Sequence, residues 1–171
     1  AGPYNNSATW GVDNLYDNDS WQASIMSYFS QTDNPNIDAD YAYLATVMPA
    51  DILAVQDLYG SNVSTRGGNT VYGAGSTVGG YLSTLFGILF DNAPANAAYY
   101  IQNPVALTLF DTGGRDTLNL SPVTVAQTIN LNSGAASSIA GGLGNLMITG
   151  GTVIEVAIGG AARDVIMGNA A

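Results

Sequence analysis

The chain has 171 residues, 47% of them hydrophobic, which is enough to bury a core in one domain or in two small ones. Thirteen acidic and three basic residues give a formal net charge of −10, and this charge makes nucleic acid and anionic membrane surfaces poor partners. The absence of cysteine excludes disulfides and thiolate metal sites, and the chain also has no histidine. No apolar stretch approaches the roughly 20 residues that span a bilayer, so we expect no membrane partner.

The negative charge is unevenly distributed along the chain. Eight of the thirteen acidic residues precede Arg66, which is the first basic residue. Two interpretations follow: the acidity keeps a secreted protein soluble, or bound cations with oxygen ligands supply the missing positive charge. The eight residues are Asp13, Asp17, Asp19, Asp33, Asp38, Asp40, Asp51 and Asp57.

Residues 1–45 are rich in Asn, Asp, Ser and Tyr and carry little periodicity, which predicts a long ordered loop region. The clearest helix is predicted over Pro49–Gly60. Proline suits a first helical turn, Asp51 complements the positive end of the helix dipole, and Gly60 can end the helix. Its apolar face is expected to be buried and comprises Ile52, Val55, Leu58 and Tyr59.

A second short helix is predicted over Tyr81–Phe90, where apolar residues recur at spacings of one, three and four, and we expect it to pack against a sheet. A core or interface element is favoured over a membrane anchor, because the stretch lacks the basic flank that such anchors use. From Val105 onward, short β-rich segments alternate with Gly, Asn and Asp, which indicates stacked sheets or a solenoid. These segments are Val105–Phe110, Asp116–Leu120, Thr128–Leu131, Leu146–Thr149, Val153–Ile158 and Asp164–Met167.

Two glycine-rich loops have the composition of oxygen-ligated cation sites. Gly159–Met167 approximates the nine-residue repeat of calcium-binding parallel β-rolls, in which tight glycine turns expose carbonyls and an aspartate, here Asp164, while Ile166 points inward. In Asp111–Leu118, two aspartates straddle Gly113 and Gly114, so that carboxylates and carbonyls can converge on one hard cation. An ordinary glycine turn before an edge strand explains the first loop as well, and a hairpin with glycine at its turn and aspartate as its cap explains the second. Each of the three arginines, Arg66, Arg115 and Arg163, lies in or beside a loop of this kind.

Several separated segments, in order, resemble the serralysin family of secreted zinc metalloendopeptidases. Together they cover most of the chain, and the part that least resembles the family is roughly residues 75–103. The segments are Ser24–Tyr28, Asp51–Gly60, Thr65–Gly73, Asp111–Asp116, Gln127–Asn132, Gly141–Asn145 and Glu155–Gly160.

The resemblance implies a mixed α and β fold that is mainly β, in two parts separated near residues 61–69. Residues 1–62 would be the end of a metzincin catalytic domain, with its Met-turn and a helix. Residues 63–171 would be the start of a calcium-binding parallel β-roll or β-sandwich domain. In the first part, Met26 would form the apolar floor beneath the zinc, and Tyr28 would ligate the metal at rest and stabilise the tetrahedral intermediate. Without the resemblance, the same pair would be a core methionine beside a half-buried tyrosine.

The family places its Met-turn after a motif with three zinc-binding histidines and a general-base glutamate. This chain has no histidine, and its only glutamate is Glu155, so it cannot form that site alone. Residues Ala1–Asn5 resemble those that follow the third histidine, which predicts a fragment that begins just after the zinc motif. The fragment would be secreted with an export signal located elsewhere, and it would pair with the missing zinc-binding segment.

Calcium ligands carry over from the family more completely than zinc ligands do. The resemblance implies carbonyl ligands at Arg66, Gly68, Thr70 and Val153, carboxylate ligands at Asp111, Asp116 and Glu155 with Gly113 and Gly114 in the same loop, and a last site at Gly160, Ala162 and Asp164. We therefore expect part of a calcium-stabilised zinc endopeptidase acting on proteins or peptides, in which this chain binds calcium, is inactive alone, and needs zinc only in the intact enzyme. The alternatives are a non-catalytic calcium-binding β-roll module for adhesion or scaffolding, and a pseudoenzyme or inhibitor of a partner protease.

Overall fold

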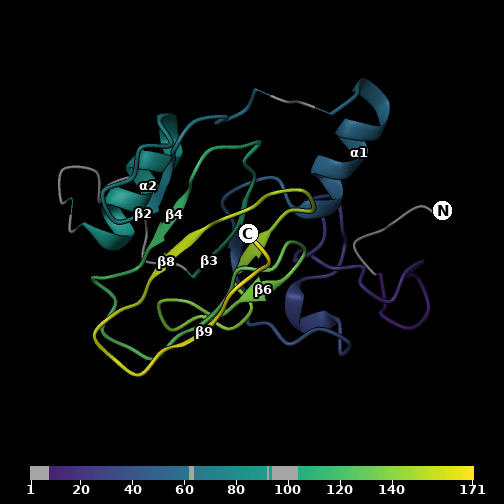
Figure 1. The fold of residues 1–171 in the computed structure, drawn as a ribbon. Helices are drawn as coiled ribbons and strands as arrows, with labels where there is room; N and C mark the ends of the chain where they lie inside the picture. Colours follow the sequence, from purple (N-terminus) through teal and green to yellow (C-terminus); the bar gives the residue numbers. More distant parts are fainter. Residues whose placement is uncertain (1–7, 62–63, 92, 94–103) are drawn as a thin grey trace.

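A computed structural model describes residues 8–61, 64–91, 93 and 104–171 of the chain. Two parts of the sequence discussed above lie outside these residues: Ala1–Asn5, and residues 92 and 94–103 of the segment 75–103. The described fold is mainly β, with two α-helices and one short 3-10 helix (Figure 1). The elements are η1 (Gln31–Asp33), β1 (Tyr43–Leu44), α1 (Pro49–Tyr59), β2 (Val71–Gly73), α2 (Gly80–Phe90), β3 (Val105–Leu109), β4 (Thr117–Asn119), β5 (Thr128–Asn130), β6 (Ala136–Ser137), β7 (Leu146–Ile148), β8 (Val156–Ile158) and β9 (Val165–Met167).

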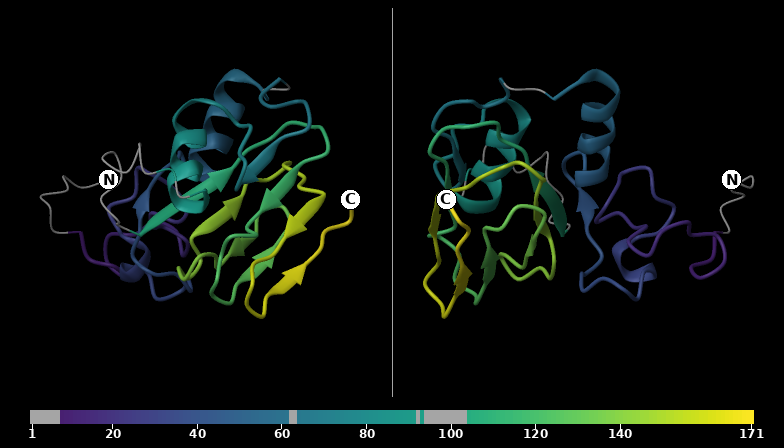
Figure 2. Two further views of the ribbon diagram at one scale, coloured as in Figure 1. Left: turned by 90° about the vertical axis from the view of Figure 1, so that its left-hand side faces the viewer. Right: turned by 45° about the vertical axis from the view of Figure 1, so that its right-hand side comes forward.

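The strands form three small sheets, which are ordered β1-β3-β7-β6, β2-β4-β8 and β5-β9. Every strand pair is parallel except β6 with β7. Because β8 pairs with β4 and β9 pairs with β5, the last part of the chain runs alongside an earlier part, as the left view of Figure 2 shows. Each of the six β-rich segments predicted from the sequence contains one of these strands.

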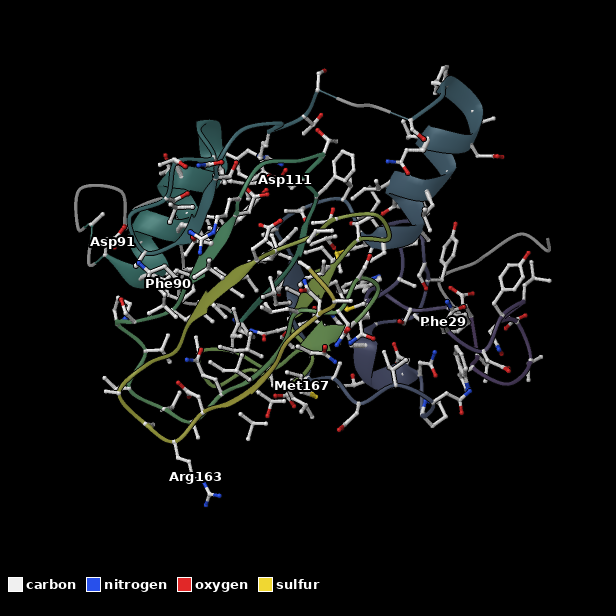
Figure 3. The ribbon with its side chains drawn as sticks, in the orientation of Figure 1. Phe29, Phe90, Asp91, Asp111, Arg163 and Met167 are labelled. Carbon is white, nitrogen blue, oxygen red and sulfur yellow. The ribbon has the colours of Figure 1, made fainter. Side chains whose placement is uncertain are left out.

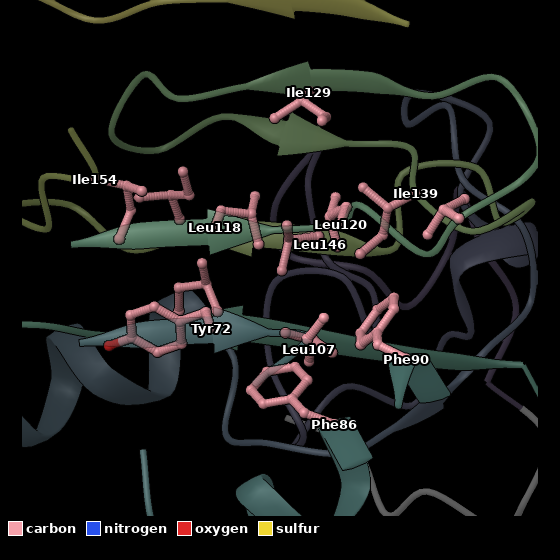
Figure 4. Close-up of a cluster of buried hydrophobic side chains, with 14 of the residues drawn as sticks. Tyr72, Phe86, Phe90, Leu107, Leu118, Leu120, Ile129, Ile139, Leu146 and Ile154 are labelled. Carbon is pink, nitrogen blue, oxygen red and sulfur yellow. The ribbon is translucent and has the colours of Figure 1, made fainter. Parts of the chain in front are cut away.

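The core lies between these sheets and α2 (Figure 4). Leu118 of β4, Ile129 of β5 and Leu146 of β7 are all almost completely buried. Helix α2 covers this core with Leu82, Phe86 and Phe90, which confirms the prediction of a helix against a sheet. Within the described residues, neither α1 nor any other helix combines the length and apolarity needed to cross a membrane.

The bounds of α1 confirm the predicted helix, but the predicted burial of its apolar face is wrong. Of the four residues, only Ile52 is buried, whereas Val55, Leu58 and Tyr59 are exposed. The helix contacts the rest of the chain through its first turn, where the Ala50 amide donates to the Ala23 carbonyl at 2.9 Å. Figures 1 and 2 show its second half projecting away from the sheets, which leaves that face without a neighbour among the described residues.

Residues 8–45, the described part of the predicted loop region, are mostly irregular apart from η1 and β1, and polar side chains fix their backbone. The buried Gln31 amide both donates to and accepts from the backbone of Ala42, and Asn34 donates to the carbonyls of Asp17 and Asp19. This region joins the β-rich part through the parallel pairing of β1 with β3. A loop contact adds to it, since the Asp40 amide donates to the Leu143 carbonyl.

Candidate functional site

Three loops meet at one edge of the β2-β4-β8 sheet. Because the three strands are parallel, the residues that precede them lie side by side at this edge. Those residues are Thr70, Asp116 and Glu155, each directly before its strand. The structure therefore brings together most of the residues for which the sequence predicted calcium binding, on the segments 65–70, 111–116 and 152–155.

Acidic side chains connect the neighbouring loops through backbone amides. The Thr70 amide donates to Asp116 Oδ1 at 2.7 Å, and the Asp116 amide donates to Glu155 Oε2 at 2.6 Å. The same arrangement recurs in the β5-β9 sheet, where the Gln127 amide donates to Asp164 Oδ1 at 3.0 Å. Each acid thus binds the loop that precedes the neighbouring strand, a contact between residues that are far apart in sequence.

Asp116 is the centre of this arrangement and is only 1% exposed. Its Oδ2 atom is buried without a hydrogen-bond partner among the described residues. Burial, together with the nearby carboxylates of Asp111 and Glu155, raises the pKa of Asp116 to about 6, although the Thr70 amide acts in the opposite direction. A buried, unpaired carboxylate oxygen with two acidic neighbours is an environment that a cation would stabilise.

Asp111 is also buried, and several groups fix its position. Its Oδ1 accepts from the Gly113 amide at 2.9 Å, and its Oδ2 accepts from the Tyr72 hydroxyl at 2.8 Å. Thr152 Oγ1 contacts both backbone groups of Asp111, accepting from its amide and donating to its carbonyl. Burial and the bond to Asp111 raise the pKa of Tyr72, which keeps the phenol protonated as a donor.

Glycine is required where the first two loops touch. Gly114 has φ +124°, and a β-carbon there would lie 2.5 Å from the carbonyl carbon of Gly68. Arg66, which lies in the first of these loops, has φ +53°. Its guanidinium donates to the Phe110 carbonyl at 2.8 Å. The loops are therefore close enough for their carbonyls to face one cation.

In the described residues, no three His, Cys, Asp or Glu side chains gather into a metal cluster. A cation at this edge would therefore need backbone carbonyls as well as carboxylates, which is the ligand mixture that calcium accepts. The orphaned Asp116 Oδ2 and the close approach of Gly68 and Gly114 fit such an ion. The third predicted segment contributes Glu155 through its bond to Asp116, while Val153 is exposed beside it.

The last predicted loop lies away from this edge, and Figure 3 shows Asp111 and Arg163 at opposite ends of the β-rich part. There Asp164 Oδ2 accepts from the Gly160 amide at 2.6 Å, while Ala162 lies between these two residues in sequence. Ile166 pairs in register with the fully buried Ile129 but is 45% exposed. Ile129 belongs to the buried core cluster, and Ile166 does not.

The turn Ser24–Tyr28 is separate from both loop groups and is held by α1. Asp51 accepts from Ser24 Oγ at 2.6 Å and from the Ile25 amide at 2.9 Å. Met26 is 75% exposed, so the interpretation as a core methionine is wrong, and Tyr28 is exposed beside it. Sequence reasoning gave Asp51 only a helix-dipole role.

Comparison with known proteins adds an independent observation. Residues 61–171 match the family model described as "Peptidase M10 serralysin C terminal". The chain is 38% identical to Metallopeptidase AprA of Pseudomonas marginalis over 98% of this chain and 32% of the relative. It is 38% identical to Serralysin G of Dickeya chrysanthemi over 92% of this chain and 30% of that relative. It is 37% identical to Serralysin of Photorhabdus luminescens over 97% of this chain and 30% of that relative. The chain thus spans about a third of the length of these relatives.

Proposed function

Because the chain belongs to the serralysin family of M10 peptidases, we propose that its residues 63–171 are a calcium-binding domain at the start of a β-roll. The cation lies at the loop edge of the β2-β4-β8 sheet. The observation that carries this proposal is the buried, unpaired Oδ2 of Asp116 beside the carboxylates of Asp111 and Glu155. Calcium would supply the positive charge that no described side chain brings to these oxygens.

The ligands that we propose follow the family pattern and the observed loop positions. Carboxylate ligands come from Asp111, Asp116 and Glu155, which do not all gather at one point, so backbone carbonyls complete the six to eight oxygens that are usual for calcium. The other ligating residues of this edge are Arg66, Gly68, Thr70, Gly113, Gly114 and Val153. A further site is proposed at Gly160, Ala162 and Asp164.

The first part of the chain, residues 1–62, is proposed to belong to the catalytic domain of an extracellular zinc endopeptidase. Zinc would supply Lewis-acid chemistry and an activated water for the hydrolysis of proteins or peptides. The residues of this chain do not by themselves fit zinc, because the chain has no histidine and the described residues contain no metal cluster. We therefore assign no reaction step to the chain alone. Its role would be to support the zinc site of the intact enzyme through Met26, Tyr28 and the Met-turn that Asp51 holds.

A non-catalytic calcium-binding module is the second candidate, and the absence of histidine favours it. Adding the zinc-binding segment of a relative, separately or fused, distinguishes the two. A chain that completes a zinc peptidase gives zinc-dependent hydrolysis of casein in this mixture, whereas a module gives none. Met26→Ala and Tyr28→Phe then lower that hydrolysis if these residues support the zinc.

Isothermal titration of the chelator-treated chain tests calcium binding directly. We expect heat on titration with calcium and a calcium-dependent rise in melting temperature, since ligand at about 100 times its dissociation constant adds about 2.7 kcal/mol per site. Asp116→Ala should remove most of this gain. Asp57→Ala removes one negative charge, as Asp116→Ala does, but on the exposed side of α1, and this variant should keep the calcium-dependent gain in stability. Absence of both heat and stabilisation in the unmodified chain refutes the proposal.

A further inference from the structure

Tyr72 of β2 connects the candidate cation site to the hydrophobic core. Its side chain is 1% exposed, and its hydroxyl lies 2.8 Å from Asp111 Oδ2 and 3.3 Å from the Phe110 carbonyl. A hydroxyl has one proton to donate, and the shorter contact to an ionised oxygen is the stronger hydrogen bond. Tyr72 therefore donates to the carboxylate.

The phenol ring itself is held from two sides. The edge-to-face contact with Phe86 places the two ring centres 6.5 Å apart, and Figure 4 shows Phe86 next to Tyr72 in the core. On the side of the loops, the Arg66 guanidinium carbon lies 6.0 Å from the centre of the Tyr72 ring. The hydroxyl is thus fixed by a strand and by core packing rather than by the glycine-containing loop.

This rigidity distinguishes Tyr72 from the other donor to the same carboxylate. The Gly113 amide binds Asp111 Oδ1 from within the glycine loop, so it moves when that loop moves. The Tyr72 hydroxyl approaches from the neighbouring strand, 39 positions earlier in the chain. A carboxylate with a fixed donor on one oxygen keeps its orientation, and its remaining lone pairs can face a cation without further ordering.

We infer that Tyr72 is a positioning residue of the calcium site, whose hydroxyl orients the Asp111 carboxylate toward the ion. The inference rests on the proposed calcium binding and extends it to a residue of the segment Thr65–Gly73 to which the resemblance assigns no role. Tyr72 is not among the ligands that we propose, and its hydroxyl acts on the ion through Asp111, to which it donates.

The test is Tyr72→Phe, which removes the hydroxyl and keeps the ring. We expect its calcium dissociation constant, measured by isothermal titration of the whole chain, to rise about 10-fold, the lower end of the effect of losing a group that orients a metal ligand. Tyr81→Phe is the matched control. Its hydroxyl also makes one short bond, 2.7 Å to the Ala45 carbonyl, but it contacts no residue of the site. The control should bind calcium as the unmodified chain does.

A purely structural role predicts a different pattern. Tyr72→Phe would then melt earlier in chelator while its calcium affinity stayed unchanged, and that result overturns the inference. If the unmodified chain binds no calcium, the proposed function has failed instead.

If Tyr72→Phe does not fold, a second measurement takes the place of this test. It records the near-ultraviolet absorption band of tyrosine in the unmodified chain and in Tyr81→Phe, with and without calcium. Calcium should shift this band in both proteins, because the ion withdraws charge from the oxygen to which Tyr72 donates. No shift in a chain that binds calcium overturns the inference.

Discussion

The two ends of the chain keep their shapes by different means. In residues 64–171, apolar side chains form one buried cluster, which runs from Tyr72 to Ile154 in sequence. In residues 8–60, large apolar side chains such as Leu15, Met26 and Leu58 are exposed. Burial therefore dominates in the β-rich part. In the first part it is limited to a few side chains, such as Phe29, Met48 and Ile52, so other contacts must contribute more.

Polar side chains take that role in the first part. Gln31, Asn34 and Asp51 each bind two or more backbone or side-chain groups in other segments. A hydrogen bond inside a protein contributes about 1 kcal/mol net, but breaking one that is buried costs more. A region fixed in this way can leave many of its apolar residues on its surface, because its shape depends less on burying them. Such a surface is suited to contact with further protein.

The largest expected effect is in the β-rich core. Leu118→Ala removes a side chain that is 1% exposed in β4, and we expect a loss of about 3 kcal/mol in the free energy of unfolding. The same substitution at Leu58, 73% exposed on α1, should change it by less than about 0.5 kcal/mol. Urea denaturation followed by circular dichroism measures both. Equal losses would contradict the comparison and show that the exposed face of α1 is covered in solution.

The second effect concerns Asp116 and pH in the absence of calcium. Its folded pKa of about 6 lies above the ordinary value of 3.8, so between these values the folded state holds a proton that the unfolded state has released. Stability in chelator therefore falls as pH rises through this window, by at most about 3 kcal/mol at roughly 1.4 kcal/mol per pKa unit.

Comparing Asp116→Asn with the unmodified chain isolates this contribution from that of other carboxylates. In chelator the variant should become the more stable protein above pH 6, because it has no buried charge, and the difference should shrink toward pH 4. Asp57→Asn, on the exposed surface of α1, is the matched control for the loss of one carboxylate. A constant difference between Asp116→Asn and the unmodified chain would show that Asp116 does not titrate in this window.

The contrast between the regions also explains what the sequence could predict. Glycines between short segments and a β-rich composition within them are local signals, so the six strand segments and the bounds of α1 could be located. Which face of α1 is buried depends on its neighbours in space. The 3.6-residue spacing of Val55 and Leu58 therefore predicted burial wrongly.

Within the candidate site, Asp111 and Asp116 were predicted from the composition of their loop and Glu155 from the resemblance to the family, but the residues that support them were not predicted. Tyr72 and Thr152 are, respectively, 39 and 41 positions away from Asp111, and only the parallel stacking of strands brings them together. Tyr72 lies in the resembling segment Thr65–Gly73 and Thr152 lies beside a β-rich segment, but neither signal specifies a partner. A contact set by sheet register requires the fold to be known first.

The smallest expected effect lies in the first region, at Asp51. Asp51→Ala removes the acceptor of the Ser24 hydroxyl and of the Ile25 and Met48 amides, and we expect a loss of about 2 kcal/mol, as for hydrogen bonds to a charged group. Because these bonds hold the turn Ser24–Tyr28 to the first turn of α1, the loss should be local. Amide hydrogen exchange should quicken at Ile25 and Met26 and stay unchanged at Ile129 in the core. Asp57→Ala, on the same helix, should leave the exchange rates in both regions unchanged. Faster exchange at Ile129 in Asp51→Ala would show that the two regions unfold together.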